Sequence, residues 1–186
     1  MKKIVKEKLL LHICCATCAA YVIEALQKNY EVIAFFYNPN IYPAKEYAIR
    51  LNEVKSYCDE NSIPLVIEKP DQKNWFELIK GHEKDPEKGE RCTICYRMRL
   101  EKTADYASKH DFFIYTTDLS ISPHKDAVRL NMLGNELGCK YDIKYLSADF
   151  KKNDGFKKAM VISRNMCFYR QNYCGCLFSL KARECR

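Results

Sequence analysis

Three groups of closely spaced cysteines are the residues of this sequence that could do chemistry. They are Cys14-Cys15-Ala16-Thr17-Cys18, Cys92-Thr93-Ile94-Cys95 and Cys174-Gly175-Cys176. Thiolates at these spacings can share a metal ion or an iron–sulfur cluster. The glycine of the third group allows a turn tight enough for a shared metal or for a disulfide. The chain has 11 cysteines, an odd number, so complete pairing is impossible and metal binding or thiol redox chemistry is indicated.

The number of thiols bears on which metal they would bind. Structural zinc needs four ligands, and the second and third groups would supply them. That arrangement leaves Cys14, Cys15 and Cys18 unexplained. An iron–sulfur cluster with four thiolates, plus a further thiol pair or a second metal, uses all three groups. We therefore predict a [4Fe–4S] cluster, with zinc as the alternative.

The remaining cysteines are isolated, and an isolated cysteine is usually a small buried apolar residue. We expect burial for Cys58, Cys139 and Cys167, and we assign no role to Cys185. His12 lies within an apolar run, and we expect it to be a hydrogen-bonded core residue rather than a ligand.

The composition is that of a globular protein in a reducing compartment. The 186 residues are 47% hydrophobic and 30% charged, which suits one packed domain over residues 1–186. No apolar run reaches the 18 residues that a membrane span needs. The apolar run of residues 9–20 is interrupted by His12 and lacks a clean signal-cleavage site. We therefore expect a cytoplasmic protein without a membrane partner.

The net charge of +7 is concentrated in one part of the chain. Residues 1–150 carry 22 basic and 22 acidic side chains, whereas residues 151–186 carry nine basic side chains against Asp154 and Glu184. Such a segment indicates a polyanionic partner, most commonly nucleic acid, with a solvated basic tail as the alternative. The nine residues are Lys151, Lys152, Lys157, Lys158, Arg164, Arg170, Lys181, Arg183 and Arg186.

The elements that must position the thiols alternate between strands and helices. Apolar runs predict buried strands. They cover residues 9–13, 32–37, 64–67 and 112–116, with a weaker fifth at 141–146. The alternation predicts a parallel sheet with helices on both faces, in which ligands bind beyond the carboxyl ends of the strands. Cys14-Cys15, Asn38-Pro39-Asn40 and Thr117-Asp118 follow three of these strands directly.

Helical periodicity appears between the strands at four places. Gly138 is predicted to end the last helix, and the polar residues 81–91 are predicted to form a loop before the C-x-x-C motif. The helix faces are formed by Val22, Ile23 and Leu26; by Tyr47, Leu51, Val54 and Cys58; by Arg97, Leu100, Ala104 and Ala107; and by Leu130, Leu133 and Leu137.

These motifs together resemble the epoxyqueuosine reductases of the QueH type, over about residues 9–180. The resemblance is carried by Leu10-Leu11-His12-Ile13-Cys14-Cys15-Ala16, Tyr37-Asn38-Pro39-Asn40-Ile41, Pro43, Glu46-Tyr47, Arg50, Arg91-Cys92, Cys95, Arg97, Arg99-Leu100, Thr103-Ala104, Thr116-Thr117, Ser122-Pro123-His124-Lys125, Tyr169-Arg170-Gln171-Asn172-Tyr173-Cys174-Gly175-Cys176 and Phe178-Ser179.

The resemblance implies a fold, a reaction and a set of roles. The fold is a Rossmann-like, three-layer α/β sheet similar to PP-loop (HUP-type) domains, with a basic, cysteine-rich helical segment at about 150–186 packing on the cluster site. The reaction is the cobalamin-independent, two-electron reduction of epoxyqueuosine to queuosine at the wobble position of tRNA. The cluster ligands implied are Cys14, Cys15, Cys92 and Cys95. Cys174 and Cys176 are implied to be a catalytic redox pair or, with Cys18, ligands of an adjacent mononuclear iron.

Further residues and partners follow from this interpretation. The partners are the anticodon arm of a tRNA carrying epoxyqueuosine and an electron donor that the sequence does not identify. The candidate proton donors are His124, Tyr173 and Asp118; Arg97 and Arg99 could bind phosphate or offset cluster charge; Phe168, Tyr169 and Tyr173 could stack on bases or pack in the core.

Two other functions compete with the reductase. One is a zinc-stabilised RNA-binding module without catalysis. The other is an ATP-consuming thiolation enzyme, which would need a Ser-Gly-Gly-type phosphate loop where this chain has Cys-Cys-Ala-Thr-Cys-Ala.

Overall fold

The chain folds around one five-stranded parallel sheet, as the computed structural model shows for residues 6–184. The strands lie in the order β3-β2-β1-β4-β5, and each pair of neighbours is parallel. Their bounds are β1 Glu7–Ile13, β2 Tyr30–Phe36, β3 Leu65–Ile67, β4 Ile114–Thr117 and β5 Lys144–Tyr145. All five predicted strands are thereby confirmed, and β1, which precedes the first thiol group, is central.

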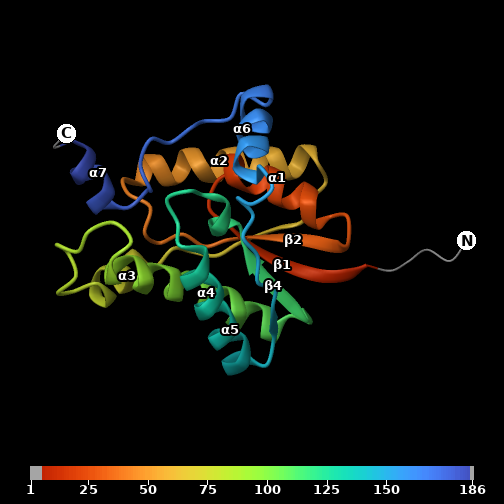
Figure 1. Cartoon of the computed structure of the whole chain (residues 1–186), viewed down its shortest axis with the longest axis horizontal. Coiled ribbons are helices and arrows are strands. Elements are labelled where there is room, and N and C mark those ends of the chain that lie inside the picture. Colours follow the sequence, from red (N-terminus) through yellow and green to blue (C-terminus); the bar gives the residue numbers. More distant parts are fainter. Residues whose placement is uncertain (1–5, 185–186) are drawn as a thin grey trace, which may run out of the picture.

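Helices cover both faces of the sheet and make three layers (Figure 1). One face carries α1 (Ala16–Leu26), α2 (Ala44–Glu60) and α6 (Gly155–Asn165). The other carries α3 (Gln72–Leu78), α4 (Glu90–Lys109) and α5 (Ala127–Tyr141). A 3-10 turn at Asp118–Ile121 follows β4, and a short helix, α7 (Leu177–Glu184), follows the third thiol group.

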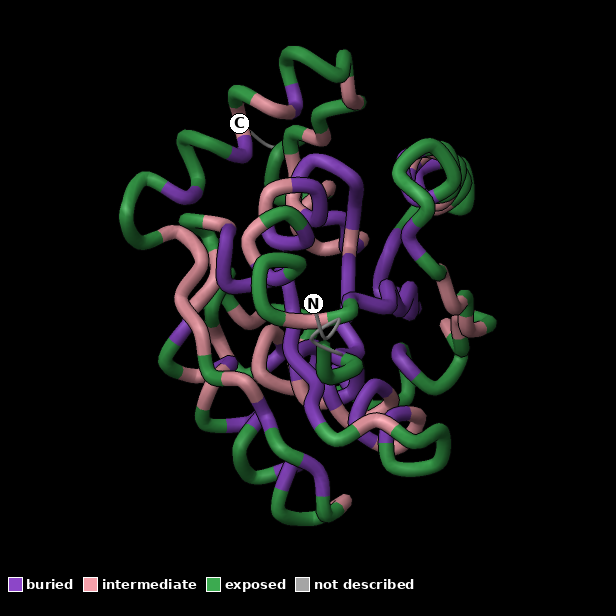
Figure 2. The backbone as a smooth tube through the Cα atoms, turned by 90° about the vertical axis from the view of Figure 1, so that its right-hand side faces the viewer, coloured by how far each residue is buried: buried purple, intermediate pink, exposed green. Residues whose placement is uncertain are grey.

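Alternating side chains of the central strands pack into two hydrophobic cores, one on each face of the sheet. Leu9, Leu11 and Ile13 of β1 face α1 and α2, whereas Leu10 faces α4 and α5. All four are fully buried, and each such side chain contributes about 1.5–3 kcal/mol relative to exposure. Buried positions fill the interior of the backbone trace, and exposed positions lie on its outer turns and helices (Figure 2). The sheet is thus a rigid base for the residues at its carboxyl edge.

Two expectations about the helices differ from the structure. Gly138 does not end α5, which continues to Tyr141 and closes with Asp142 in the left-handed conformation. Glycine is present at 138 because an added Cβ would lie 2.6 Å from the carbonyl oxygen of Ile143. Two helices, α3 and α6, were not among the predicted elements. In α6 the buried residues are Gly155, Ala159 and Ser163, which are too small or polar to give an apolar stripe.

No helix among the described residues is both long enough and apolar enough to cross a membrane. Cys185 and Arg186, to which the sequence analysis referred, lie outside the described residues.

Candidate metal centre

The first thiol group lies where β1 ends and α1 begins. Cys15 is the N-cap of α1 and Cys18 lies in its first turn. The three sulfur atoms of Cys14, Cys15 and Cys18 lie within 4.8 Å of one another, and those of Cys14 and Cys15 are 3.8 Å apart. The amino end of a helix carries partial positive charge and favours thiolate there. Hydrogen bonds from Cys14 and Cys18 hold the pKa of Cys15 well below its usual range.

A buried carboxyl group borders the first thiol group. Asp118, directly after β4, is fully buried, and its Oδ2 accepts a hydrogen bond of 3.1 Å from the backbone N–H of Cys14. Burial, followed by the negative charge of Cys15, raises the pKa of Asp118 well above its usual range. Its other oxygen has no hydrogen-bond partner among the described residues. A buried, incompletely satisfied oxygen beside three thiols is available to a metal or to a reacting group.

The second and third thiol groups line one cavity, although about 80 residues separate them. Cys92 and Cys95 lie in the first two turns of α4, after a turn-rich loop over residues 81–89, as predicted. They share the cavity with Cys174 and Cys176. Its other lining residues are Trp75, Arg91, Tyr96 and Lys125. The cavity therefore holds four thiols, two aromatic rings and two cations.

Two cations, one half-buried and one buried, face these thiols. Lys125 Nζ donates a hydrogen bond of 2.6 Å to Cys174 Sγ. Arg99 is 2% exposed, and its Nε donates to the carbonyl oxygen of Cys95 at 3.2 Å. A hydrogen bond from Cys176 is the main cause that lowers the pKa of Cys174 well below its usual range, and Lys125 and Arg99 act in the same direction. The site is thus built to hold negative charge on sulfur.

The two arginines that follow the C-x-x-C motif have different surroundings. Arg99 lies among the thiols, where Cys95, Cys174 and Cys14 raise its pKa against the effect of burial. Arg97 instead lies at the surface and forms a two-pronged ion pair with Glu136, with N–O distances of 2.7 and 2.9 Å. Offsetting sulfur charge is therefore a role that Arg99 can perform and Arg97 cannot.

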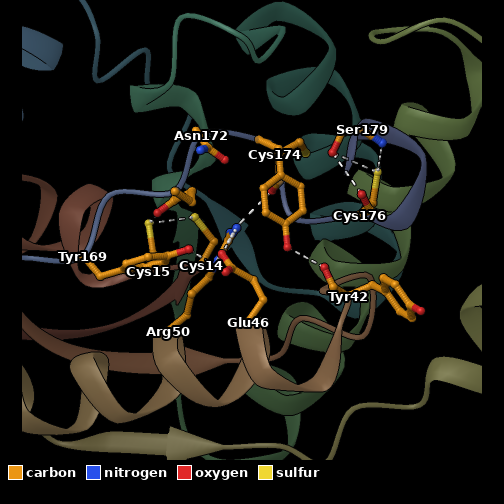
Figure 3. A network of polar contacts seen from close by, with 12 residues as sticks. Cys14, Cys15, Tyr42, Glu46, Arg50, Tyr169, Asn172, Cys174, Cys176 and Ser179 are labelled. Atoms are coloured by element: carbon orange, nitrogen blue, oxygen red, sulfur yellow. Dashed lines mark hydrogen bonds and ion pairs between the residues drawn. The ribbon is translucent and has the colours of Figure 1, made fainter. Parts of the chain in front are cut away.

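A segment that we call the strap, residues 167–176, connects the first thiol group to the cavity. It follows α6 and runs past the beginning of α1 and α2 before it reaches α7 (Figures 1 and 3). Gln171 Nε2 lies 3.2 Å from Cys15 Sγ, and Thr17 Oγ1 donates to the carbonyl oxygen of Tyr169. Five residues after Tyr169, Cys174 enters the cavity. All three thiol groups therefore gather at the carboxyl edge of the sheet.

The core histidine and the isolated cysteines differ in how deeply they are buried. His12 is fully buried and contacts Thr117 Oγ1 and the carbonyl oxygen of Tyr37, and burial lowers its pKa to about 3, so the predicted core role is confirmed. Cys58 is buried, as expected. The expectation of burial was wrong for Cys139 and Cys167, which are exposed. Cys139 points away from the buried face of α5, and Cys167 begins the strap in a left-handed conformation.

The candidate proton donors and stacking aromatics have distinct positions. His124 is exposed, whereas Asp118 is enclosed. Tyr173 donates its hydroxyl to the carbonyl oxygen of Tyr42. Phe168 packs edge-on against Tyr57 in the core. Tyr169 is 37% exposed.

Glu46 and Arg50, which were expected only as part of the family resemblance, form a buried ion pair of α2 beneath the strap. Their spacing of four residues on a helix was the available signal.

The donor set fits a thiophilic metal centre. Thiolate ligands suit an iron–sulfur cluster or zinc, and no carboxylate is among the described residues that line the cavity. Arg99 and Lys125 would offset part of the negative charge that four thiolates carry. Some of these thiols are buried and others are partly exposed, so a metal centre here would have ligands inside the protein and a side that solvent can reach. The buried ones are Cys15, Cys95 and Cys176, and the partly exposed ones are Cys14, Cys18, Cys92 and Cys174.

Known proteins resemble this chain in sequence and in fold. A family model described as "Epoxyqueuosine reductase QueH" matches residues 9–182. Proteins with that name from Haemophilus influenzae and Acinetobacter baylyi are 44% and 42% identical; the alignments cover 94% of this chain and 72% and 81% of those proteins. One from Thermotoga maritima is 31% identical over 94% of this chain and 91% of that protein.

Two solved structures share the fold at low sequence identity. A U34-tRNA thiolase NcsA from Methanococcus maripaludis, solved with its [4Fe-4S] cluster, has a TM-score of 0.57 and 14% identity, and the match covers 97% of this chain and 65% of that one. A predicted tRNA methyltransferase subunit from Methanocaldococcus jannaschii has a TM-score of 0.54 and 13% identity, covering 84% and 74%. The predicted Rossmann-like α/β class is confirmed.

Proposed function

The chain belongs to the epoxyqueuosine reductase QueH family, and we propose that the thiol-rich carboxyl edge of its sheet is where the epoxide is reduced. The protein is an oxidoreductase that converts epoxyqueuosine to queuosine in tRNA. The reaction takes up two electrons and two protons, turns the epoxide into an alkene and releases its oxygen as water. The observation that supports this location is the convergence of all three thiol groups at one edge.

The cofactor that we propose is a [4Fe–4S] cluster, which supplies electrons one at a time when bound. The shared cavity favours Cys92, Cys95, Cys174 and Cys176 as the residues that hold it, since they come from two turns that face each other. This division differs from the one that the resemblance implied, in which Cys14 and Cys15 join Cys92 and Cys95. It leaves the first group free to hold the adjacent mononuclear iron or to exchange electrons as a thiol pair.

Side chains at this edge stabilise thiolate, exclude water and leave two thiols accessible. Lys125 and Arg99 stabilise thiolate at Cys174 and Cys95. Trp75 and Tyr96, both nearly fully buried, exclude water from the inner wall of the cavity. The partly exposed thiols Cys14 and Cys174 then lie on the side from which a flipped base would approach.

We propose that the segment 150–186 is part of the same domain and binds the tRNA backbone. Contacts of the strap with α1 and α2 attach it to the sheet. Exposed basic side chains of α6, the strap and α7 would contact phosphates, which positions an RNA without reading its sequence. They are Lys157, Lys158, Arg164, Arg170, Lys181 and Arg183.

The experiment that tests the function is an anaerobic turnover assay. The protein, reconstituted with iron and sulfide, is mixed with dithionite and a tRNA that carries epoxyqueuosine, with no cobalamin added. Mass spectrometry of the nucleosides should show loss of one oxygen atom. A fully loaded protein that leaves epoxyqueuosine unchanged would refute the proposal.

The ligand set is tested by the colour of single variants. Cys92→Ala should lose the brown colour under either division. Cys174→Ala should lose it if the four cavity thiols hold the cluster, but should keep it and lose turnover if Cys14 and Cys15 are the ligands. Cys14→Ala should show the opposite pattern. Cys139→Ala, at an exposed thiol, is the matched control and should keep both colour and turnover.

A further inference from the structure

Arg50 is enclosed between α2 and the strap (Figure 3). It is 1% exposed, and burying a guanidinium is costly unless its charge and its N–H groups are matched. Its Nε donates to Glu46 Oε1 at 2.7 Å, and its Nη1 lies 3.4 Å from the carbonyl oxygen of Cys174. The ring of Tyr173 lies 5.8 Å from its guanidinium carbon. The guanidinium is thus surrounded by a carboxylate of α2 and by a carbonyl oxygen and an aromatic ring of the strap.

The turn that carries the third thiol group rests directly on this cation. Gly175 has a φ of +112°, and a Cβ added there would lie 2.9 Å from Nη1 and 3.1 Å from Nη2 of Arg50. A side chain at this position would therefore separate the turn from the guanidinium. The close approach explains why a residue without a Cβ lies between Cys174 and Cys176.

The same ion pair also reaches the other end of the strap. The second oxygen of Glu46, Oε2, accepts a hydrogen bond of 2.7 Å from the hydroxyl of Tyr169. Near the turn, the backbone N–H of Tyr42 donates to the carbonyl oxygen of Gly175 at 2.8 Å. The start of α2 and the residues before it therefore hold the strap at two points five or six residues apart.

We propose that Arg50 is a positioning residue: paired with Glu46, it braces the strap and keeps the Cys174-Gly175-Cys176 turn in the cavity that Cys92 and Cys95 line. Arg50 acts through the turn, because at 1% exposure its side chain is enclosed. A lysine would keep the charge but could not donate to both Glu46 and the carbonyl of Cys174, because only the planar fork of arginine presents several donors in fixed directions. The inference rests on the proposed function only for what the thiols bind.

Hydrogen exchange of the metal-free protein tests the brace independently of activity. Two strap-linked amides report it: that of Tyr42, bonded to Gly175, and that of Tyr169, bonded to the carboxylate of Glu53. Arg50→Met should speed exchange at both on the order of tenfold, and Arg50→Lys by less, while amides of β1 stay unchanged. Arg97→Met, which removes an exposed ion pair from α4, is the matched control and should change neither amide.

Unchanged exchange at Tyr42 and Tyr169 in a folded Arg50→Met protein would overturn the proposal. If Arg50→Met does not fold, Tyr169→Phe decides, because it removes one hydroxyl from Glu46 at a partly exposed position. That variant should speed exchange at the Tyr42 amide, and no change would equally overturn the brace. The two proposals can fail separately. If the wild-type protein binds its cluster but does not reduce epoxyqueuosine, and the exchange pattern is as expected, the proposed function is refuted and the role of Arg50 is retained.

Discussion

Neutralising two lysines of α6 tests where the RNA backbone lies. Lys157 and Lys158 are exposed, and α6 packs antiparallel to α1, with Ser163 beside Thr17 and Gly155 beside Tyr21. The first thiol group therefore lies near the carboxyl end of α6. Lys157 is six residues from Ser163, about 9 Å along the helix axis. An RNA whose modified base enters the thiol-rich edge would pass within reach of both lysines.

The size of the effect follows from counterion release. Each phosphate contact contributes about 0.7 to 0.9 to the slope of log affinity against log salt, so losing two contacts should reduce the slope by about 1.4 to 1.8. Between 50 and 200 mM salt, the wild-type affinity should then fall about 7- to 12-fold more than that of the double variant Lys157→Gln/Lys158→Gln. The difference between the two proteins should be largest at low salt.

The assay is binding of an anticodon stem-loop to the metal-free protein over a series of salt concentrations. Lys28→Gln/Lys144→Gln is the matched control, because it removes the same charge from exposed positions near the amino ends of β2 and β5. Its slope should equal that of the wild type. If the α6 variant also keeps the wild-type slope, α6 does not contact the RNA backbone and the reasoning from charge is refuted.

Two further predictions concern the thiols and the core. In reduced, metal-free protein at pH 8, iodoacetamide should modify the exposed Cys139 and Cys167 quickly and Cys58 slowly, because burial raises the pKa of Cys58 to about 12 and blocks access; peptide mapping that finds Cys58 modified as fast would contradict this. Burial likewise raises the pKa of Tyr57 to about 12, so the folded state holds that proton more tightly than the unfolded state, whose tyrosine titrates near 10. The corresponding stability is present below about pH 10 and lost between about pH 10 and 12, and urea titrations should show a shallower loss in Tyr57→Phe than in the wild type.

Much of the fold could be predicted from local patterns. The strands are short runs of buried apolar residues, so β1, β2 and β4 appear in the sequence directly. The helix that follows β1 begins at Ala16, directly after Cys15, whose backbone is still extended. The prediction for Gly138 failed because glycine also occurs where two segments touch, and only the tertiary structure shows that contact.

The cysteines of the candidate site could be predicted from the sequence, but which of them share one cavity could not. Spacing identifies which cysteines act together locally, as in Cys14, Cys15 and Cys18. It does not show that Cys92 and Cys174 share a cavity, because that depends on how the strap returns across the sheet. A charge-offsetting role for Arg99 was among the expectations, but the burial of Arg50 and Arg99 was not, since arginine in a helix is usually solvated and a sequence does not show which face is covered.

The position of Cys174 and Cys176 along the chain sets an order of events during biosynthesis. Both thiols are translated after every strand of the sheet, and folding on the ribosome proceeds from the amino end. The cavity that we propose to hold the cluster therefore lacks one of its walls until the strap has been synthesised. Under that proposal, the cluster can be loaded only after the whole sheet has been synthesised.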